Sequence, residues 1–224
     1  MKLGVLLPTF RDNADDAFTT AREAEDAQLD GVFAYDHLWP MGSPERPSLA
    51  PFPVLASVAA QCPRLFVGPL VSRVGLFSTA TLVEQYLTLE ALAPRRVIAA
   101  LGTGDKLSAA ENTAYGLVYA SADTRRELLK ETIVALAPSI EVWCGAGSDK
   151  TNELARELGV TLNLWGVSAE VARDAASSSA VTWAGTLGDD PVALLDDLRA
   201  AGVSWVVAAP PFQIDVLGEW RQAR

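Results

Sequence analysis

Hydrophobic residues in this chain gather in short runs, and each run is followed by a segment with helical spacing of apolar positions. Eight runs have the length and composition of buried strands, at residues 3–8, 32–35, 65–71, 97–101, 140–144, 161–165, 181–184 and 203–209. Continuous apolar runs of this length are typical of strands that are buried on both faces, as in a parallel sheet. The pattern therefore predicts eight strand–helix repeats.

Eight such repeats favour a closed architecture. A parallel sheet needs crossover helices, and eight is the number of strands that closes a (β/α)8 TIM barrel. The chain of 224 residues is short for such a barrel but lies within its range. The alternative is an open, doubly wound sheet. We predict an α/β fold in which residues 1–224 form a single barrel domain.

Local signals mark several helix starts. Three pairs have the spacing of a capping box, in which a hydroxyl and an acid three residues later satisfy free N–H groups: Thr81 with Glu84, Ser108 with Glu111, and Thr124 with Glu127. Asp190 followed by Pro191 combines a cap residue with proline at the first helical position.

Composition and charge narrow the function classes. Half of the residues are hydrophobic, which excludes disorder, and a net charge of −10 argues against wrapping of nucleic acid. Cys62 and Cys144 lie far apart, which indicates an intracellular chain without a disulfide framework. No apolar run reaches the roughly 18 residues of a membrane span, and the first residues lack a signal-peptide pattern. We expect a cytoplasmic protein with no membrane or nucleic-acid partner.

The second apolar run ends in Asp36 and His37, and His37 is the only histidine of the chain. A proline-rich loop over residues 39–51 follows, and long loops in compact domains are usually functional. Barrel enzymes carry their catalytic groups at such strand ends. The alternative interpretation of His37 is a histidine hydrogen-bonded into the barrel rim.

Two glycine-rich turns follow the fourth and fifth runs, Gly102-Thr103-Gly104-Asp105 and Gly145-Ala146-Gly147-Ser148. Each opens a predicted helix, and free N–H groups at a helix N-terminus attract phosphate. Together, on neighbouring strands, they indicate a phosphorylated ligand. The alternative is that the glycines only permit tight turns.

Five stretches carry a resemblance to a known family. They are residues 29–40 (LDGVFAYDHLWP), 65–71 (LFVGPLV), 95–97 (RRV), 102–105 (GTGD) and 145–165. In this order they resemble the bacterial-luciferase-like oxidoreductases, and the resemblance covers most of the chain. The resemblance implies a (β/α)8 barrel, in agreement with the count of repeats.

The family resemblance also implies a cofactor, either FMN or the deazaflavin coenzyme F420. Gly-Thr-Gly followed by an acid is similar to the deazaflavin branch. By the same resemblance, His37 is an acid–base group beside the reactive ring with Asp36 next to it, and Asp105 is an acid for proton transfer. Leu70-Val71 falls where the family often has a non-prolyl cis peptide. The residues implied in cofactor binding are Leu70, Val71, Ser72, Gly102, Thr103, Gly104, Ser108, Gly145, Ala146 and Gly147.

The residue types suit hydride transfer to or from a small organic molecule. When hydride leaves an alcohol carbon, a proton must leave the oxygen, and a group that titrates near neutrality does this best. Histidine is such a group, and an adjacent carboxylate can hold it in one tautomer. Weaker candidates at strand ends are Arg11, Arg73 and Lys106, for which surface solvation is the preferred interpretation, and Cys144, Trp165 and Trp183.

One departure from the family leaves the mechanism open. Relatives insert a long segment between the seventh strand and its helix, whereas here residues 183–188 reach the helix almost directly. Either the loop over residues 39–51 or a second subunit of a homodimer closes the site, or catalysis has been lost. The alternatives are thus an FMN-dependent oxidoreductase or monooxygenase and a non-catalytic flavin-binding protein. A barrel metallohydrolase is disfavoured, because such sites usually need several histidines.

Overall fold

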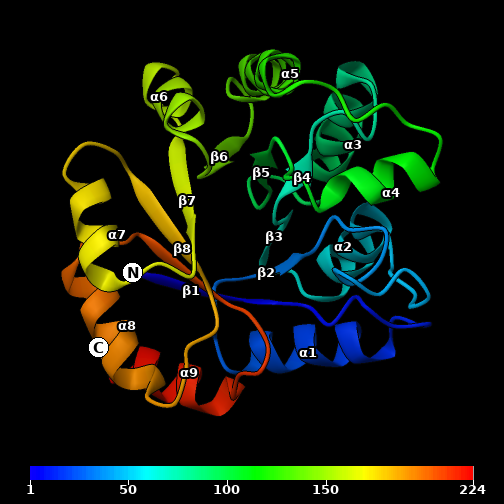
Figure 1. Cartoon of the computed structure of the whole chain (residues 1–224). Helices are drawn as coiled ribbons and strands as arrows, with labels where there is room; N and C mark the ends of the chain where they lie inside the picture. The colour runs from blue at the N-terminus through cyan, green and yellow to red at the C-terminus, as the bar shows by residue number, and fades with distance from the viewer. Residues whose placement is uncertain (224) are drawn as a thin grey trace.

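The computed structural model describes residues 1–223, which form a ring of parallel strands surrounded by helices (Figure 1). The strands are β1 (Lys2–Leu6), β2 (Gly31–Ala34), β3 (Phe66–Pro69), β4 (Ser72–Arg73), β5 (Ile98–Gly102), β6 (Glu141–Gly145), β7 (Thr161–Trp165), β8 (Val181–Gly185) and β9 (Trp205–Ala208). The helices are α1 (Asp15–Asp26), α2 (Pro51–Gln61), α3 (Thr79–Leu92), α4 (Ser108–Ala114), α5 (Ala122–Leu136), α6 (Asp149–Glu157), α7 (Ala169–Ala176), α8 (Pro191–Ala200) and α9 (Ile214–Gln222).

The strands follow the order β3-β2-β1-β9-β8-β7-β6-β5-β4, and every pairing is parallel. The ring closes between β3 and the start of β5, because a parallel bridge joins Val67 to Val97 and the Val67 N–H donates to the Arg96 carbonyl at 2.8 Å. The closed (β/α)8 barrel is therefore confirmed over the open sheet.

The predicted third strand, residues 65–71, ends early as β3 at Pro69, and the separate two-residue strand β4 follows just beyond the run. The break between β3 and β4 is at Leu70 and Val71, whose peptide bond is cis, as the family resemblance implied. β3 pairs with β2, and β4 pairs with β5 on the other side. This division gives nine strands where eight runs were predicted.

Large aromatic rings fill the barrel interior. Phe33 lies 5.4 Å from Trp143 between ring centroids, and Trp205 lies 5.6 Å from Trp143. Glycines on neighbouring strands make room for them: a Cβ at Gly4 would lie 3.0 Å from the Phe33 ring, and one at Gly31 would lie 3.2 Å from the Trp205 ring. The barrel is thus a packed core beneath its mouth and not a pore.

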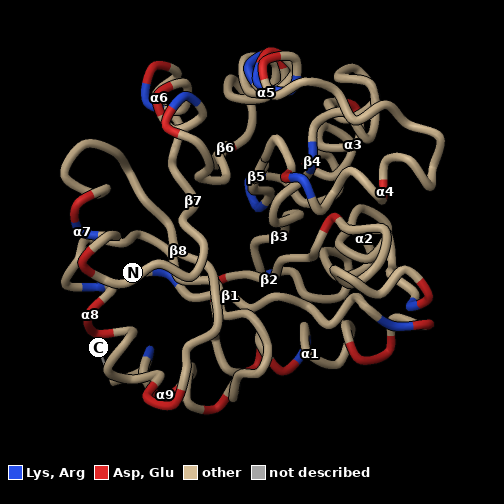
Figure 2. The backbone as a smooth tube through the Cα atoms, viewed as in Figure 1, with Lys and Arg blue, Asp and Glu red and all other residues tan. Residues whose placement is uncertain are grey.

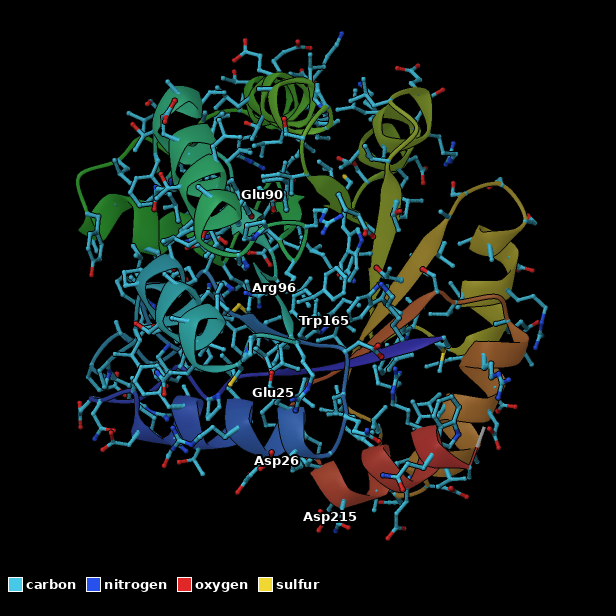
Figure 3. The ribbon with its side chains drawn as sticks, turned by 180° about the vertical axis from the view of Figure 1, so that it is seen from behind. Glu25, Asp26, Glu90, Arg96, Trp165 and Asp215 are labelled. Carbon is cyan, nitrogen blue, oxygen red and sulfur yellow. The ribbon has the colours of Figure 1, made fainter. Side chains whose placement is uncertain are left out.

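A second layer of apolar residues packs between the strands and the helices, since alternate strand residues point outward. Arg96, labelled in Figure 3, connects the start of β5 to this layer. Its guanidinium donates hydrogen bonds to the carbonyl groups of Ala59, Cys62 and Leu65. The Arg95-Arg96-Val97 stretch therefore fixes β5 against the end of α2 and the start of β3.

The helix caps differ from the predicted ones. Serines three residues before the predicted threonines cap α3 and α5: Ser78 Oγ accepts from the Thr81 N–H, and Ser121 Oγ accepts from the Thr124 N–H. In each pair the two hydroxyls also share a hydrogen bond. At α3 and α5, the capping pair is therefore a serine with a threonine, and not the predicted threonine with a glutamate. The cap at Asp190 with Pro191 is confirmed.

The connection from β8 to α8 covers only residues 186–190, so the compact form without the long insertion is confirmed. Acidic residues are spread over the outer helices, as Figure 2 shows. Within residues 1–223, no helix combines the length and the apolar character that crossing a membrane requires.

Candidate active site

A cavity of about 530 Å³ opens at the carboxyl ends of the strands, and we call it the mouth cavity. Predicted site residues that line it are His37, Leu70, Val71, Gly102, Thr103, Gly104, Asp105, Ser108, Gly145, Ala146 and Gly147. The other lining residues are Phe10, Tyr35, Met41, Arg73, Asn163 and Trp165. The strand ends thus bring nearly all the predicted residues to one place.

Two predicted residues do not line the mouth cavity. Ser72 is fully buried, and its hydroxyl accepts a hydrogen bond from the Tyr86 hydroxyl at 2.9 Å. Asp36 is buried beneath Arg73, whose backbone N–H donates to Asp36 Oδ2 at 3.0 Å. Burial raises the pKa of Asp36, and the Arg73 contacts offset this only in part. Neither side chain is placed to contact a molecule in the cavity.

The carboxylate that contacts His37 belongs to Glu111, on α4. Its Oε1 lies 2.8 Å from His37 Nδ1, and its Oε2 accepts from the Leu38 N–H at 2.9 Å and from Arg73 Nη2 at 2.7 Å. Glu111 is only 2% exposed and Arg73 only 4%. The expectation that Asp36 holds the imidazole was wrong, as was the surface interpretation of Arg73.

Glu111 also determines the protonation pattern of the imidazole. An ionised carboxylate can only accept hydrogen bonds, so His37 Nδ1 must carry a hydrogen. The other nitrogen, Nε2, has no hydrogen-bond partner among residues 1–223. A neutral His37 in this tautomer therefore presents an unprotonated nitrogen, which can accept a proton.

The first glycine turn is ordered by its own acid. Asp105 Oδ1 accepts from the Leu107 N–H at 2.9 Å, from the Ser108 N–H at 3.1 Å and from the Ser108 hydroxyl at 3.2 Å. Gly104 has φ +69°, a conformation that favours glycine. Asp105 thus caps α4 in place of the predicted Ser108–Glu111 box, and its role in proton transfer stays a prediction.

In the second glycine turn, two backbone N–H groups that could bind a phosphate already donate to other residues. The Ala146 N–H donates to the Asn163 carbonyl at 2.8 Å, and the Gly147 N–H donates to Asn152 Oδ1 at 3.0 Å. For this turn to hold phosphate through either N–H, one of these bonds must first break. Gly145 instead serves close packing, because a Cβ there would lie 3.3 Å from Val71 Cγ1, whereas Gly147 has no such close neighbour.

Val71 projects over the ends of the two neighbouring strands. A Cβ at Gly102 would lie 2.6 Å from Val71 Cγ2, and one at Gly145 would lie 3.3 Å from Val71 Cγ1. A side chain at Gly102 would overlap with Val71, and one at Gly145 would crowd it. These glycines therefore shape the floor on which a planar ligand can rest.

Sequence reasoning missed most of the aromatic lining. Trp165 lines the cavity, whereas Trp183 is buried and its indole N–H donates to the Val167 carbonyl at 2.8 Å.

Cys144 is buried, and burial raises the pKa of its thiol to about 12, so it is an inert core residue. Arg11 pairs with Asp16 at the surface at 3.0 Å.

Comparison with known proteins agrees with this architecture. A sequence model of the luciferase-like monooxygenase family matches residues 1–138, and the chain belongs to this family. It is 28% identical over 213 residues to an F420-dependent hydroxymycolic acid dehydrogenase of Mycobacterium tuberculosis, covering 92% of this chain and 56% of the relative. It is 31% identical over 114 residues to an F420-dependent glucose-6-phosphate dehydrogenase of Kineococcus radiotolerans, covering 50% of this chain and 33% of the relative. The chain spans little more than half the length of the first relative and a third of the second.

Solved structures share the fold. An F420-dependent secondary alcohol dehydrogenase, in complex with an F420-acetone adduct, aligns with a TM-score of 0.79 at 13% identity over 97% of both chains. The monooxygenase RslO1 from Streptomyces bottropensis aligns with a TM-score of 0.73 at 14% identity over 99% of this chain and 97% of its own. At such identities the likeness concerns the barrel alone.

Proposed function

We propose that this chain binds coenzyme F420 in the mouth cavity and transfers hydride between it and a small organic molecule. The observation that carries the proposal is the imidazole of His37 at the cavity wall, held through Nδ1 by the buried Glu111 at 2.8 Å. The F420 dependence of the curated relatives supports the choice of cofactor.

The residues of the cavity suit an alcohol–carbonyl interconversion. The deazaflavin, when bound, supplies a ring carbon that accepts or returns hydride. As the carbinol C–H bond breaks and hydride leaves with its electron pair, His37 Nε2 takes the hydroxyl proton and the C=O bond forms. Glu111, still ionised, then stabilises the imidazolium that results. Reduction of a ketone is the reverse, with His37 as the proton donor.

The lining fits a flat, oxygen-rich cofactor. Val71, above Gly102 and Gly145, offers an apolar floor for the ring system, and the turn at Gly104 allows backbone to approach a ligand closely. Arg73 Nη1 is buried and has no hydrogen-bond partner among the described residues. A ligand oxygen bound against β4 would satisfy this donor.

The second candidate function is FMN-dependent oxidation, since the structure of the monooxygenase RslO1 shares the fold. A non-catalytic flavin-binding protein is the third. The cavity itself does not distinguish FMN from the deazaflavin, because both have the same tricyclic outline and ribityl phosphate chain.

Parallel titrations of the purified protein with F420 and with FMN, followed by cofactor fluorescence, distinguish these functions. We expect saturable binding of F420 that is at least tenfold tighter than binding of FMN. Gly104→Val should weaken the F420 affinity, whereas Gly159→Val, also at positive φ but remote from the cavity, should not. Preferential binding of FMN would favour the FMN-dependent alternative over F420. Binding of neither cofactor would refute both the proposed function and this alternative.

A further inference from the structure

Aromatic residues at the ends of three strands line the mouth cavity besides the glycine turns. Phe10 follows β1, Tyr35 follows β2, and Trp165, labelled in Figure 3, is the last residue of β7. Phe10 and Tyr35 stack at 5.0 Å between ring centroids with planes 11° apart, and Tyr35 lies 6.2 Å from Trp165. Met41, from the proline-rich loop, joins them. We call these four residues the aromatic wall.

Two residues of the aromatic wall keep large apolar surfaces in water. Trp165 is 52% exposed and Met41 is 54% exposed, although both border a cavity. Concave sites with several exposed apolar side chains are typical of ligand binding, because a ligand removes that surface from water. The aromatic wall and Val71 line the same cavity, so a ligand there has apolar contacts available from both.

The charges around the mouth cavity disfavour an anionic substrate. Arg73 is the only arginine or lysine that lines the cavity in the part of the chain that the structure describes. It is 4% exposed and donates to the carboxylate of Glu111 at 2.7 Å. Tyr35 adds no charge, because burial raises the pKa of its hydroxyl to about 12. The Glu111 carboxylate balances the charge of Arg73, and its unpaired Nη1 is the donor proposed above for an oxygen of the cofactor. A phosphate or carboxylate on the substrate would therefore find no uncompensated cation among the lining residues.

We infer that the aromatic wall is a substrate subsite for an uncharged alcohol or ketone with a cyclic or branched apolar skeleton. This inference rests on the proposed function, which places the reacting carbon near His37. It separates this chain from those relatives whose names give glucose 6-phosphate as the substrate. Ring stacking and methionine contacts favour a flat or cyclic hydrocarbon portion over a polar sugar.

The subsite can be tested without turnover by fluorine NMR of protein labelled with 5-fluorotryptophan. The chain has six tryptophans, and Trp165→Phe identifies the Trp165 resonance by its loss. Cyclohexanol is the uncharged probe and glucose 6-phosphate the charged one, each titrated with and without F420. We expect a saturable shift of the Trp165 resonance with cyclohexanol only. The resonance of Trp220, on α9 away from the cavity, serves as the internal control.

A matched pair of variants tests the contribution of the wall. Phe10→Ala should weaken cyclohexanol binding about tenfold, the effect of losing about one aromatic contact. Phe77→Ala, which truncates a 45% exposed phenylalanine outside the cavity, should leave it unchanged. No Trp165 shift with cyclohexanol, or an equal shift with glucose 6-phosphate, would overturn the inference. Loss of F420 binding is read separately by the fluorescence titration, so the two proposals fail in distinguishable ways.

Discussion

The substitution Glu111→Gln tests how the protein controls its only histidine. The carboxylate accepts three hydrogen bonds, two of them at Oε2 from the Leu38 N–H and Arg73 Nη2, and one at Oε1 from His37 Nδ1. In the variant, the amide oxygen can keep the first two partners. The amide NH₂ then faces His37 Nδ1, and because it can only donate, Nδ1 must accept. The proton of a neutral ring moves to Nε2.

Two magnitudes follow from this geometry. Arg73 loses its carboxylate partner at a buried site, and breaking such a pair costs about 3–5 kcal/mol. Because the amide keeps two of the three hydrogen bonds, we expect the lower end, about 3 kcal/mol of the free energy of unfolding. A ring with its proton on Nε2 cannot accept the substrate proton there, so kcat should fall by about 10²–10⁴, the range for a lost acid–base group.

Long-range ¹H–¹⁵N correlation spectra read the tautomer directly, since the chain has one histidine and gives one imidazole pattern. At a pH where the ring is neutral, the wild type should show the proton on Nδ1 and Glu111→Gln should show it on Nε2. Glu45→Gln, on the exposed loop, is the control and should match the wild type. The same tautomer in the wild type and Glu111→Gln would refute the reasoning.

Three further predictions concern stability. Gly68→Ala should lower the free energy of unfolding by about 3 kcal/mol, because its Cβ would lie 2.1 Å from the Ile98 carbonyl oxygen where β3 meets β5; an unchanged urea midpoint would contradict this. Trp143→Ala should lower the free energy of unfolding by about 3–5 kcal/mol, whereas Trp165→Ala at the exposed mouth should lower it by less than about 1 kcal/mol. Equal losses of stability in the two variants would contradict the close packing of the barrel interior. The raised pKa of Asp36 means that the folded state binds its proton more tightly than the unfolded state, so wild-type stability is lost as pH rises above the ordinary value of 3.8. The stability of Asp36→Asn relative to the wild type should therefore increase between pH 4 and pH 8 in urea unfolding, and a decrease would show that Arg73 outweighs burial.

The fold was predictable because its signals are local. Apart from the two-residue β4, the strands lie in apolar runs, and the helices repeat their apolar residues within a few turns. The break at Leu70 and Val71, which separates β3 from β4, was not visible in the pattern of hydrophobicity, since both residues are apolar. The caps of α3 and α5 were displaced by three residues because threonine serves equally well as a cap or as its partner.

The sequence predicted only those site residues that directly follow a strand. His37 and both glycine turns follow apolar runs, so parallel strands must bring them to one mouth. Glu111 was assigned to a local cap because it stands three residues after Ser108. Its real partners, His37 and Arg73, lie 74 and 38 residues away in sequence. Contacts at such separations depend on the closure of the barrel, and a single sequence does not reveal them.

Reduction of F420 by uncharged secondary alcohols, compared between the wild type and His37→Ala at equal cofactor saturation, tests the central claim most directly. We expect both proteins to bind F420 with the same affinity. The rate of reduction in the variant should be lower by about 10²–10⁴, the value of a positioned acid–base group. Equal rates in the two proteins would remove His37 from the chemistry, and no reduction by the wild type with any alcohol of the panel would contradict the proposed activity itself.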